Sequence, residues 1–272
     1  MRRFYIVSAI LLAVVMLAAC GGDRKNKERP LLPEFEELTF AEQREGCYDV
    51  KISYQHIKNC EASPAFELIE RRNIELTLPY VEALEGVDVS FEERVEGYME
   101  EFREMFDSEY MTSCNLNLRH SAFFARNNTV LCYERDLYTY LGGAHGMNML
   151  HYTCYDVATG QHYDFSYLNG GEWTEALSAL ICSRLLENYA PNELFLGESQ
   201  RLHIPDSVLI TDEGLLLVYQ PYEIAPYSTG IVTVELSDAD IAATGAPLLW
   251  VESPSEHEAD ADAQADADVD IE

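Results

Sequence analysis

Two segments marked by glycine and proline hold the residues best placed to contact a ligand. The first is YLGGAHG, residues 140–146, in which Gly142, Gly143 and His145 separate two strand-like runs. Its three glycines allow positive backbone φ and a close approach of the main chain to another molecule. The segment is therefore either a tight connection between strands, with His145 hydrogen-bonded to the loop, or an exposed loop that contacts a ligand.

The second segment is QPYEIAPYSTG, residues 220–230. Its prolines exclude pairing as a central strand. Tyr222 and Tyr227 are then either contacts at the rim of a binding surface or caps of the core whose hydroxyls reach water. Glu223, next to Tyr222, is the candidate for direct contact with a basic group.

The chain offers little that enzyme chemistry requires. It contains no GxSxG, HExxH or P-loop pattern. His145 and His151 are six residues apart, and on an extended strand a separation of roughly 20 Å prevents both from binding one metal ion. We therefore expect no catalytic residue, cofactor or metal site, although a carboxylate pair that hydrolyses glycans has no fixed spacing by which to find it.

The start of the chain carries a targeting signal. Basic residues precede an apolar run from Phe4 to Ala19, and the run ends in LAAC at Cys20. This is the lipobox pattern of bacterial lipoproteins. We therefore expect a signal peptide over residues 1–19 and a lipid anchor on Cys20, which is a diacylglyceryl group with acyl chains of the palmitate type. The protein would then lie outside the cytoplasm, on the outer membrane or the cell surface. An ordinary secretory signal and an uncleaved anchor are the alternatives.

Six further cysteines suit disulfides in an oxidising compartment. Cys132 and Cys154 are centred on Gly143, so a symmetric hairpin about that residue places them opposite one another. In a non-hydrogen-bonded pair their Cα atoms would be roughly 4.5 Å apart, which is within disulfide range. We therefore predict a disulfide between them. The partners of the other four stay unassigned: Cys47, Cys60, Cys114 and Cys182.

The charge of the chain is strongly negative. The formal net charge is −30, and residues 31–251 alone hold 37 acidic and 12 basic residues. Nucleic acid is not expected as a partner, because phosphates require a basic surface. A cationic partner would be attracted over a long range, whereas the alternative role for this charge is solubility alone.

Regular patterns predict an α+β fold with a largely antiparallel sheet. Ser63-Pro64 predicts a helix start, and Ser90 with Glu93 is a capping box. Asn127-Asn128 interrupts two strand-like runs and predicts a hairpin turn. Residues 34–43 are either a short helix or more linker. The predicted helices cover residues 63–78, 90–106, 173–189 and 238–243, and the predicted strands cover 47–57, parts of 115–157, 208–210, 215–219 and 231–236.

The composition divides the chain into five parts, two of which form a single compact unit. After the signal peptide we expect a tether over residues 20–43, followed by an N-terminal part of the folded unit, 44–110, and its C-terminal domain, 111–251. Residues 252–272 are a low-complexity acidic tail, for which disorder is expected.

Four motifs in order resemble one family of envelope proteins. They are GGAHG, YDVATG at 155–160, LITDEGL at 209–215 and PYEIAPYSTG. Together they are similar to the RsiV-like extracytoplasmic domain of lysozyme-sensing anti-sigma factors, also found in peptidoglycan deacetylases of the PdaC type. The resemblance covers about residues 123–243 and implies an α+β domain that binds lysozyme in the anti-sigma members. It establishes no catalytic residue.

The chain departs from that family in two respects. No segment resembles a cytoplasmic sigma-binding region or a deacetylase domain, so neither activity is expected. Cysteines stand at 132 and 154, where the family pattern usually has serine and asparagine. We therefore expect a non-catalytic envelope lipoprotein that binds lysozyme, another cationic protein or peptidoglycan. The alternatives are a peptidoglycan-acting enzyme or accessory, and a structural envelope lipoprotein.

Overall fold

The computed structural model describes residues 31–78, 89–107, 113–164, 174–196, 205 and 207–246. The predicted signal peptide, the lipidation site Cys20 and the acidic tail 252–272 lie outside these residues. The chain divides into two compact units, whereas the sequence led us to expect one. The first holds the described residues up to Ala122 together with 138–146 and 157–161, and the second holds 123–137, 147–156 and the described residues from 162 onward.

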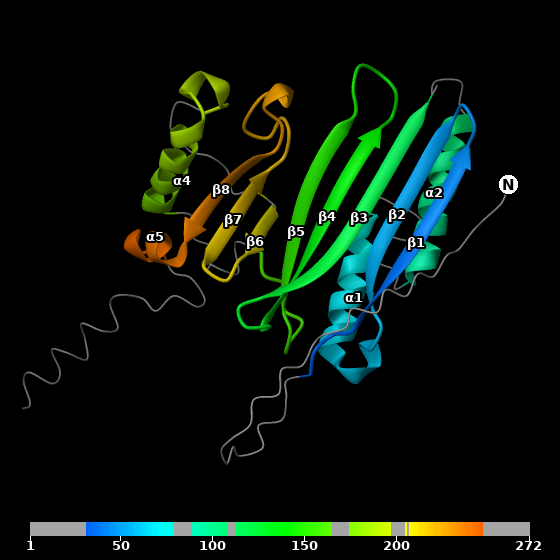
Figure 1. Cartoon of the computed structure of the whole chain (residues 1–272), viewed down its shortest axis with the longest axis horizontal. Helices are drawn as coiled ribbons and strands as arrows, with labels where there is room; N and C mark the ends of the chain where they lie inside the picture. The colour runs from blue at the N-terminus through cyan, green and yellow to red at the C-terminus, as the bar shows by residue number, and fades with distance from the viewer. Residues whose placement is uncertain are drawn as a thin grey trace, which may run out of the picture. The chain divides into compact units, whose positions relative to one another are not determined.

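The first unit pairs strands with two helices. It contains β1 (Phe35–Arg44), β2 (Tyr48–Ile57), η1 (Cys60–Ala62), α1 (Pro64–Thr77), α2 (Phe91–Asp107) and most of β3 (Cys114–Ala125). Strand β1 pairs antiparallel with β2 over its whole length, and β2 pairs parallel with β3. Helices α1 and α2 lie against one face of these strands (Figure 1).

Both helices begin where the sequence predicts. The Ser63 hydroxyl accepts a hydrogen bond from the Ala65 amide at 3.2 Å, and a proline occupies the first turn of α1. Ser90 and Glu93 form the reciprocal capping box before α2, with distances of 2.9 and 3.2 Å. These side chains satisfy amide groups that the first turn of a helix leaves without intrahelical partners.

The core of the first unit follows the alternation of the strands. Every second side chain is buried from Tyr48 to Tyr54 of β2 and in the first half of β3, which gives the sheet one largely apolar face. The residues that fill the space between this face and the helices include Val50, Ile52, Tyr54, Leu116, Leu118, Phe66, Ile69, Phe91, Met99 and Phe102. Tyr54 stacks on Phe91 and on His120, with ring centroids 4.8 and 4.7 Å apart.

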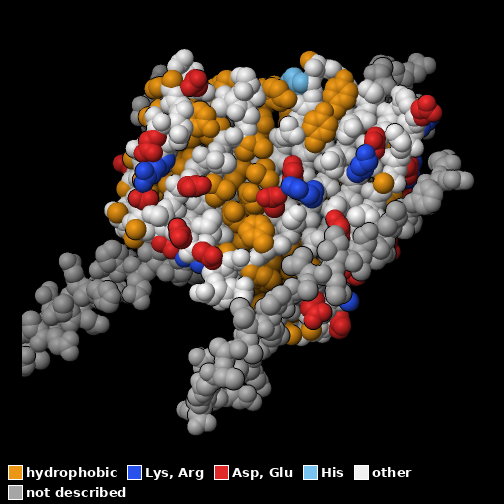
Figure 2. Space-filling model, in the orientation of Figure 1, with side chains coloured by type: hydrophobic (Ala, Val, Ile, Leu, Met, Phe, Trp, Pro, Cys, Tyr) orange, Lys and Arg blue, Asp and Glu red, His pale blue; other side chains and the backbone are white. Residues whose placement is uncertain are grey.

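The second unit contains parts of β3 and β4 (Val130–Tyr140), β5 (Met147–Asp156), α4 (Glu175–Asn188), η3 (Pro191–Glu193), β6 (Ser207–Ile210), β7 (Gly214–Tyr219), η4 (Tyr227–Thr229), β8 (Val232–Ser237) and α5 (Asp238–Ala243). Strands β6, β7 and β8 form an antiparallel meander, with α4 beside β8 (Figure 1). Hydrophobic side chains gather over β5, β6 and β7 on the face seen in Figure 2.

The structure confirms the α+β class, with one local error in the prediction. The first sheet has the strand order β1-β2-β3-β4-β5. Residues 35–44 form strand β1, so the expectation of a short helix or linker over 34–43 is wrong. The β1 sequence buries only Phe40, and its conformation depends on ten paired positions with β2 rather than on a pattern of its own.

Candidate functional site

The 140–146 loop joins β4 to β5 in the first unit. Gly142 and Gly143 have φ of +85° and +100°, which a side chain would disfavour, whereas Gly146 leaves room for the ring of Tyr138. The hydroxyl of Tyr140 donates to the Gly143 carbonyl at 3.0 Å. His145 is exposed, and its Nδ1 lies 3.0 Å from the Gly146 carbonyl oxygen. The loop is therefore a tight strand connection that also presents an exposed imidazole.

The 220–230 loop joins β7 to β8 in the second unit and is held by its own backbone. The Glu223 amide donates to the Gln220 carbonyl at 3.0 Å, and the Gly230 amide donates to the Tyr227 carbonyl at 3.0 Å. Ile224 and Ala225 are buried in the core of the unit. The two candidate loops belong to different units.

The side chain of Gln220 fastens this loop to β5. Its Oε1 accepts a hydrogen bond from the Leu150 amide at 3.0 Å, and its Nε2 donates to the Leu150 carbonyl at 2.7 Å. The amide group therefore occupies both backbone positions that a neighbouring strand would otherwise pair with. Nothing in the sequence pattern indicated this role, because Gln220 reads as an ordinary polar loop residue.

Tyr222 and Tyr227 form an aromatic pair at the surface. Their ring centroids are 5.6 Å apart with an interplanar angle of 29°. Tyr222 is 52% exposed and has φ of +72°, which is unusual for a bulky residue. Phe195, 56% exposed, lies on a neighbouring segment, because its amide donates to the Ile224 carbonyl at 2.7 Å.

The structure gives Glu223 a role within the loop itself. Its Oε2 accepts a hydrogen bond from the Gln220 amide at 2.6 Å, so the carboxylate holds the loop's own backbone. A carboxylate that caps a backbone amide loses freedom to turn toward another molecule. Glu223 is therefore a residue that positions Tyr222, and the tyrosine pair is what the loop presents.

The structure brings the predicted cysteine pair together. The Sγ atoms of Cys154 and Cys132 are 3.2 Å apart, and both side chains are fully buried. Glu134 and Tyr152, which lie equally far on either side of Gly143, are also joined, because the Tyr152 hydroxyl donates a hydrogen bond of 2.9 Å to Glu134. A disulfide requires a separation of about 2.05 Å. Both cysteines are free thiols here, so the disulfide itself stays a prediction.

Backbone groups of strand β6 contact the two thiols. Sγ of Cys132 lies 3.6 Å from the Ile210 carbonyl oxygen, and Sγ of Cys154 lies 3.7 Å from the Val208 carbonyl oxygen. The Ile210 amide donates to Sγ of Cys154 at 3.4 Å. These contacts connect β4 and β5 to β6 within the second unit. The other four cysteines are free thiols too, so their pairing stays unassigned.

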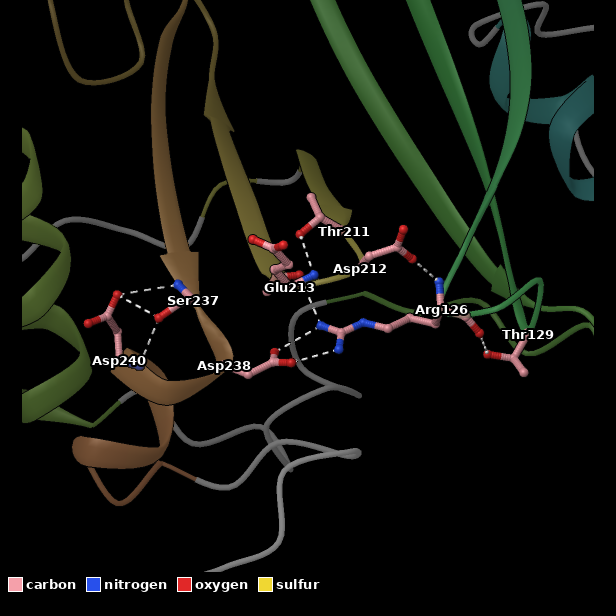
Figure 3. Close-up of polar contacts among 9 residues, drawn as sticks. Arg126, Thr129, Thr211, Asp212, Glu213, Ser237, Asp238 and Asp240 are labelled. Carbon is pink, nitrogen blue, oxygen red and sulfur yellow. Dashed lines mark hydrogen bonds and ion pairs between the residues drawn. The ribbon is translucent and has the colours of Figure 1, made fainter.

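Arg126 is a residue whose role the sequence did not reveal. Arg126, Asn127 and Asn128 all have positive φ, which confirms the predicted turn between β3 and β4. The Arg126 amide donates to Asp212 at 2.6 Å, and its guanidinium donates to both carboxylate oxygens of Asp238 at 2.6 and 2.8 Å (Figure 3). One arginine therefore ties the β3–β4 turn to the β6–β7 turn and to the first residue of α5.

A buried carboxylate plays a similar part in the first unit. Glu70 on α1 accepts hydrogen bonds from the Tyr54 hydroxyl at 2.8 Å and from the Ile57 amide at 3.0 Å. Nδ1 of His56 lies 2.8 Å from the same carboxylate. This hydrogen bond with Glu70 raises the pKa of His56 above its ordinary value of 6.5, against the opposing effect of burial.

Surface hollows occur away from both candidate loops. One of about 470 Å³ is lined by Arg184, Glu187, Asn188, Thr233, Val234, Glu235, Ser237 and Asp240. Another of about 540 Å³ is lined by Cys60, Pro64, Glu67, Leu68, Glu70, Arg71 and Ile74.

Among the described residues, no group of three or more histidine, cysteine or acidic side chains is arranged to hold a metal ion. No described helix has the length and apolar character that crossing a membrane requires.

Comparison with known proteins identifies the fold. Residues 169–238 match the model of a protein family of unknown function, DUF3298. The structure is similar to the crystal structure of a DUF3298 family member from Bacteroides fragilis NCTC 9343, with TM-score 0.63, 15% identity, and coverage of 83% of this chain and 96% of that one. It is also similar to a DUF3298 family protein from Pseudomonas aeruginosa PAO1, with TM-score 0.52, 20% identity, and coverage of 78% and 93%.

No curated protein matches the chain. The matched segment contains α4, β6, β7, β8 and the 220–230 loop, whereas the 140–146 loop precedes it. This chain therefore shares its fold with two solved DUF3298 proteins, and residues 169–238 are the part of it that matches the DUF3298 family model.

Proposed function

We propose that this chain is a lipoprotein of the bacterial cell envelope whose folded part binds a cationic protein without catalysing a reaction, with lysozyme as the first candidate. The excess of acidic residues carries this proposal, since residues 31–251 hold 37 acidic and 12 basic side chains. Such an excess attracts basic proteins over distances longer than a contact. The lipid anchor rests on the LAAC motif at Cys20.

Several of the few basic side chains are engaged within the chain. Several lysines and arginines in the described residues form ion pairs with the chain's own carboxylates: Lys51 with Asp49, Arg72 with Glu75, Arg103 with Glu42 and Glu96, Arg126 with Asp238, and Arg184 with Glu187 and Asp240. They are therefore poorly placed to attract an anionic partner. The uncompensated carboxylates favour fast association with a cationic partner, and salt should weaken this association.

The comparisons support the same direction at the level of the fold. Two of the four motifs that resemble the RsiV-like domain, LITDEGL and PYEIAPYSTG, lie within residues 169–238 of the DUF3298 match, and the anti-sigma members of that RsiV-like family bind lysozyme. The 140–146 and 220–230 loops are the proposed contact regions, because they present His145 and the Tyr222–Tyr227 pair on short, internally bonded connections.

Surface plasmon resonance tests the proposal. The soluble chain from Gly21 onward is immobilised, and hen-type lysozyme is injected at low and at high salt. Succinylated lysozyme, in which the lysine ammonium groups have become carboxylates, is the matched control. We expect native lysozyme to bind at low salt and weaken at high salt, and the succinylated form not to bind. Deletion of the residues after Ser253 should lower the association rate modestly, because these residues add eight acidic side chains to the field.

Two outcomes would contradict the proposal. The first is a failure of native lysozyme and of other basic proteins to bind at low salt, which would favour a structural lipoprotein. The second is the release of soluble glycan from purified sacculi by the same soluble chain, which would favour a peptidoglycan-acting enzyme.

A further inference from the structure

We infer that the 220–230 loop is an arginine-selective stacking site, in which the exposed face of Tyr222, backed by Tyr227, takes a guanidinium group. The inference rests on the proposed function, because it names the side-chain chemistry by which this loop would recognise a cationic partner. It specifies arginine rather than lysine, and stacking rather than an ion pair, as the selective contact.

The backbone of Tyr222 gives the first reason. Its φ of +72° lies in the left-handed region, which glycine and asparagine adopt far more readily than an aromatic residue. The side chain at this strained position is also 52% exposed, so core packing does not repay the strain. Strained residues of this kind are concentrated at functional sites. The position therefore presents a ring to solvent at a cost in folding stability.

The rigidity of the loop gives the second reason. Gln220 holds the loop to Leu150 through two hydrogen bonds, of 3.0 and 2.7 Å. Ile224 and Ala225 anchor it in the core. Tyr227 supports the ring of Tyr222 from one side, at a centroid distance of 5.6 Å. A ring held in this way loses little conformational entropy when a ligand stacks on it.

The nearby carboxylates give the third reason. Oε2 of Glu223 accepts the Gln220 amide at 2.6 Å, and Oε2 of Glu193 accepts the Ala190 amide at 2.7 Å. Both carboxylates are therefore committed to backbone positions, although their charge still favours a cation nearby. Exposed aromatic side chains, Tyr222 and Phe195, remain as the contacting surface.

A neutral aromatic face beside fixed negative charge discriminates between the two basic side chains. The guanidinium of arginine is planar and weakly hydrated, so it stacks on a ring at little cost in hydration. The ammonium of lysine is compact and strongly hydrated, so it is retained in water. Long-range attraction by the acidic chain acts on both side chains alike. Selectivity for arginine therefore reports the tyrosine pair, and binding as such reports the total charge.

The experiment compares two peptides of equal charge, nona-arginine and nona-lysine, by isothermal titration or fluorescence anisotropy with the soluble chain from Gly21 onward. In the wild type we expect nona-arginine to bind more tightly. Tyr222→Gly should lower the ratio of nona-arginine affinity to nona-lysine affinity by about two- to five-fold, the size of one exposed cation–π contact. Salt-sensitive binding of both peptides should persist. Tyr222→Phe should retain the preference, because the ring remains.

The variants are chosen to stay folded. Glycine relieves the positive φ at position 222, so thermal unfolding of Tyr222→Gly should occur at or near the wild-type temperature. The charge control is Glu235→Gln, an exposed carboxylate on β8 away from the loop. It should weaken the binding of both peptides by the same factor and leave their ratio unchanged.

The outcomes separate this inference from the proposed function. Equal affinity for the two peptides, or an arginine preference that Tyr222→Gly leaves undiminished, would overturn the stacking site and leave the cationic-partner proposal standing. Failure of both peptides to bind at low salt would overturn both. Binding of an uncharged N-acetylglucosamine tetramer that Tyr222→Gly abolishes would assign the tyrosine pair to a sugar ring, and so overturn arginine selectivity.

Discussion

Oε1 of Glu70 on α1 lies 2.8 Å from Nδ1 of His56 on β2, so a buried carboxylate joins a helix to a strand through a titratable imidazole. The same carboxylate accepts hydrogen bonds from Tyr54 and Ile57. Glu36, 4.0 Å from Nε2 of His56, and Glu92 add further negative charge around the ring. The stability of the first unit therefore depends on the protonation of one histidine.

The stability of the first unit should fall as pH rises through the range in which His56 loses its proton. The Glu70 hydrogen bond raises the pKa of folded His56 above 6.5, so the stabilisation is fully present below about pH 6.5 and is lost as pH rises through the folded pKa. Urea unfolding midpoints between pH 5.5 and 8.5 measure this slope. His56→Gln should flatten it, and His145→Gln, an exposed histidine in the same unit, should not. Equal slopes in both variants would contradict the assignment.

Arg126 should stabilise the second unit through its two-pronged contact with Asp238. Replacement by lysine keeps the charge and loses the paired geometry, so Arg126→Lys should lower the free energy of unfolding by about 1.5–3 kcal/mol. The control is Arg184→Lys, whose side chain is 37% exposed and whose pairs should contribute less. A double-mutant cycle with Asp238→Asn measures the coupling. Additive effects in that cycle would show that the pair is not an energetic unit.

Cys132 and Cys154 should be joined by a disulfide when the chain matures in an oxidising compartment. The hydrogen bond between the thiols, together with burial, raises the pKa of Cys132. Oxidation of the folded protein should therefore be slow, because the thiolate is the reactive form. We expect exported protein to contain the bond and protein made in a reducing cytoplasm to lack it, with a difference of about 3 kcal/mol in unfolding free energy. Peptide mapping without reductant that finds free thiols at both positions in exported protein would contradict this pairing.

Cys20 should determine the location of the protein. Cys20→Ala removes the sulfur that would carry the diacylglyceryl group, so the variant should leave the detergent phase in a phase-partition assay or accumulate as unprocessed precursor. Cys47→Ala serves as the control, because it also removes one cysteine and should partition like the wild type. Normal processing and detergent partitioning of Cys20→Ala would show that the anchor lies elsewhere.

The sequence predicted the elements whose signals are local. The capping box at Ser90 and Glu93 placed the start of α2, and Asp238–Ala243 forms the predicted short helix α5. The turn at Asn127-Asn128 and the cysteine pair centred on Gly143 follow from the geometry of single hairpins. Each of these signals lies within a few residues of the feature it specifies, or within one hairpin.

The features that the sequence did not predict depend on contacts between distant residues. Strand β1 is defined by its pairing with β2, and the glycine at position 46, with φ of +72°, is its clearest local sign. The partners of Arg126 lie 86 and 112 residues further along the chain, at Asp212 and Asp238. The sequence suggested that Glu223 contacts a basic group, and it gave no sign that this carboxylate accepts a hydrogen bond from the Gln220 amide. Side-chain direction in a loop is fixed by its folded path, which composition does not encode.

The parallel pairing of β2 with β3 determines the order in which the first unit can assemble. Tyr48 pairs with Cys114, so two helices must be made before β2 receives its second neighbour. The β1–β2 hairpin can form as soon as its residues emerge. Until β3 pairs with β2, however, the other edge of β2 has unpaired backbone groups that can associate with other chains. Because the chain is made from its N-terminus, this edge of β2 is exposed before β3 exists, and the arrival of residues 114–119 is the step that ends the exposure.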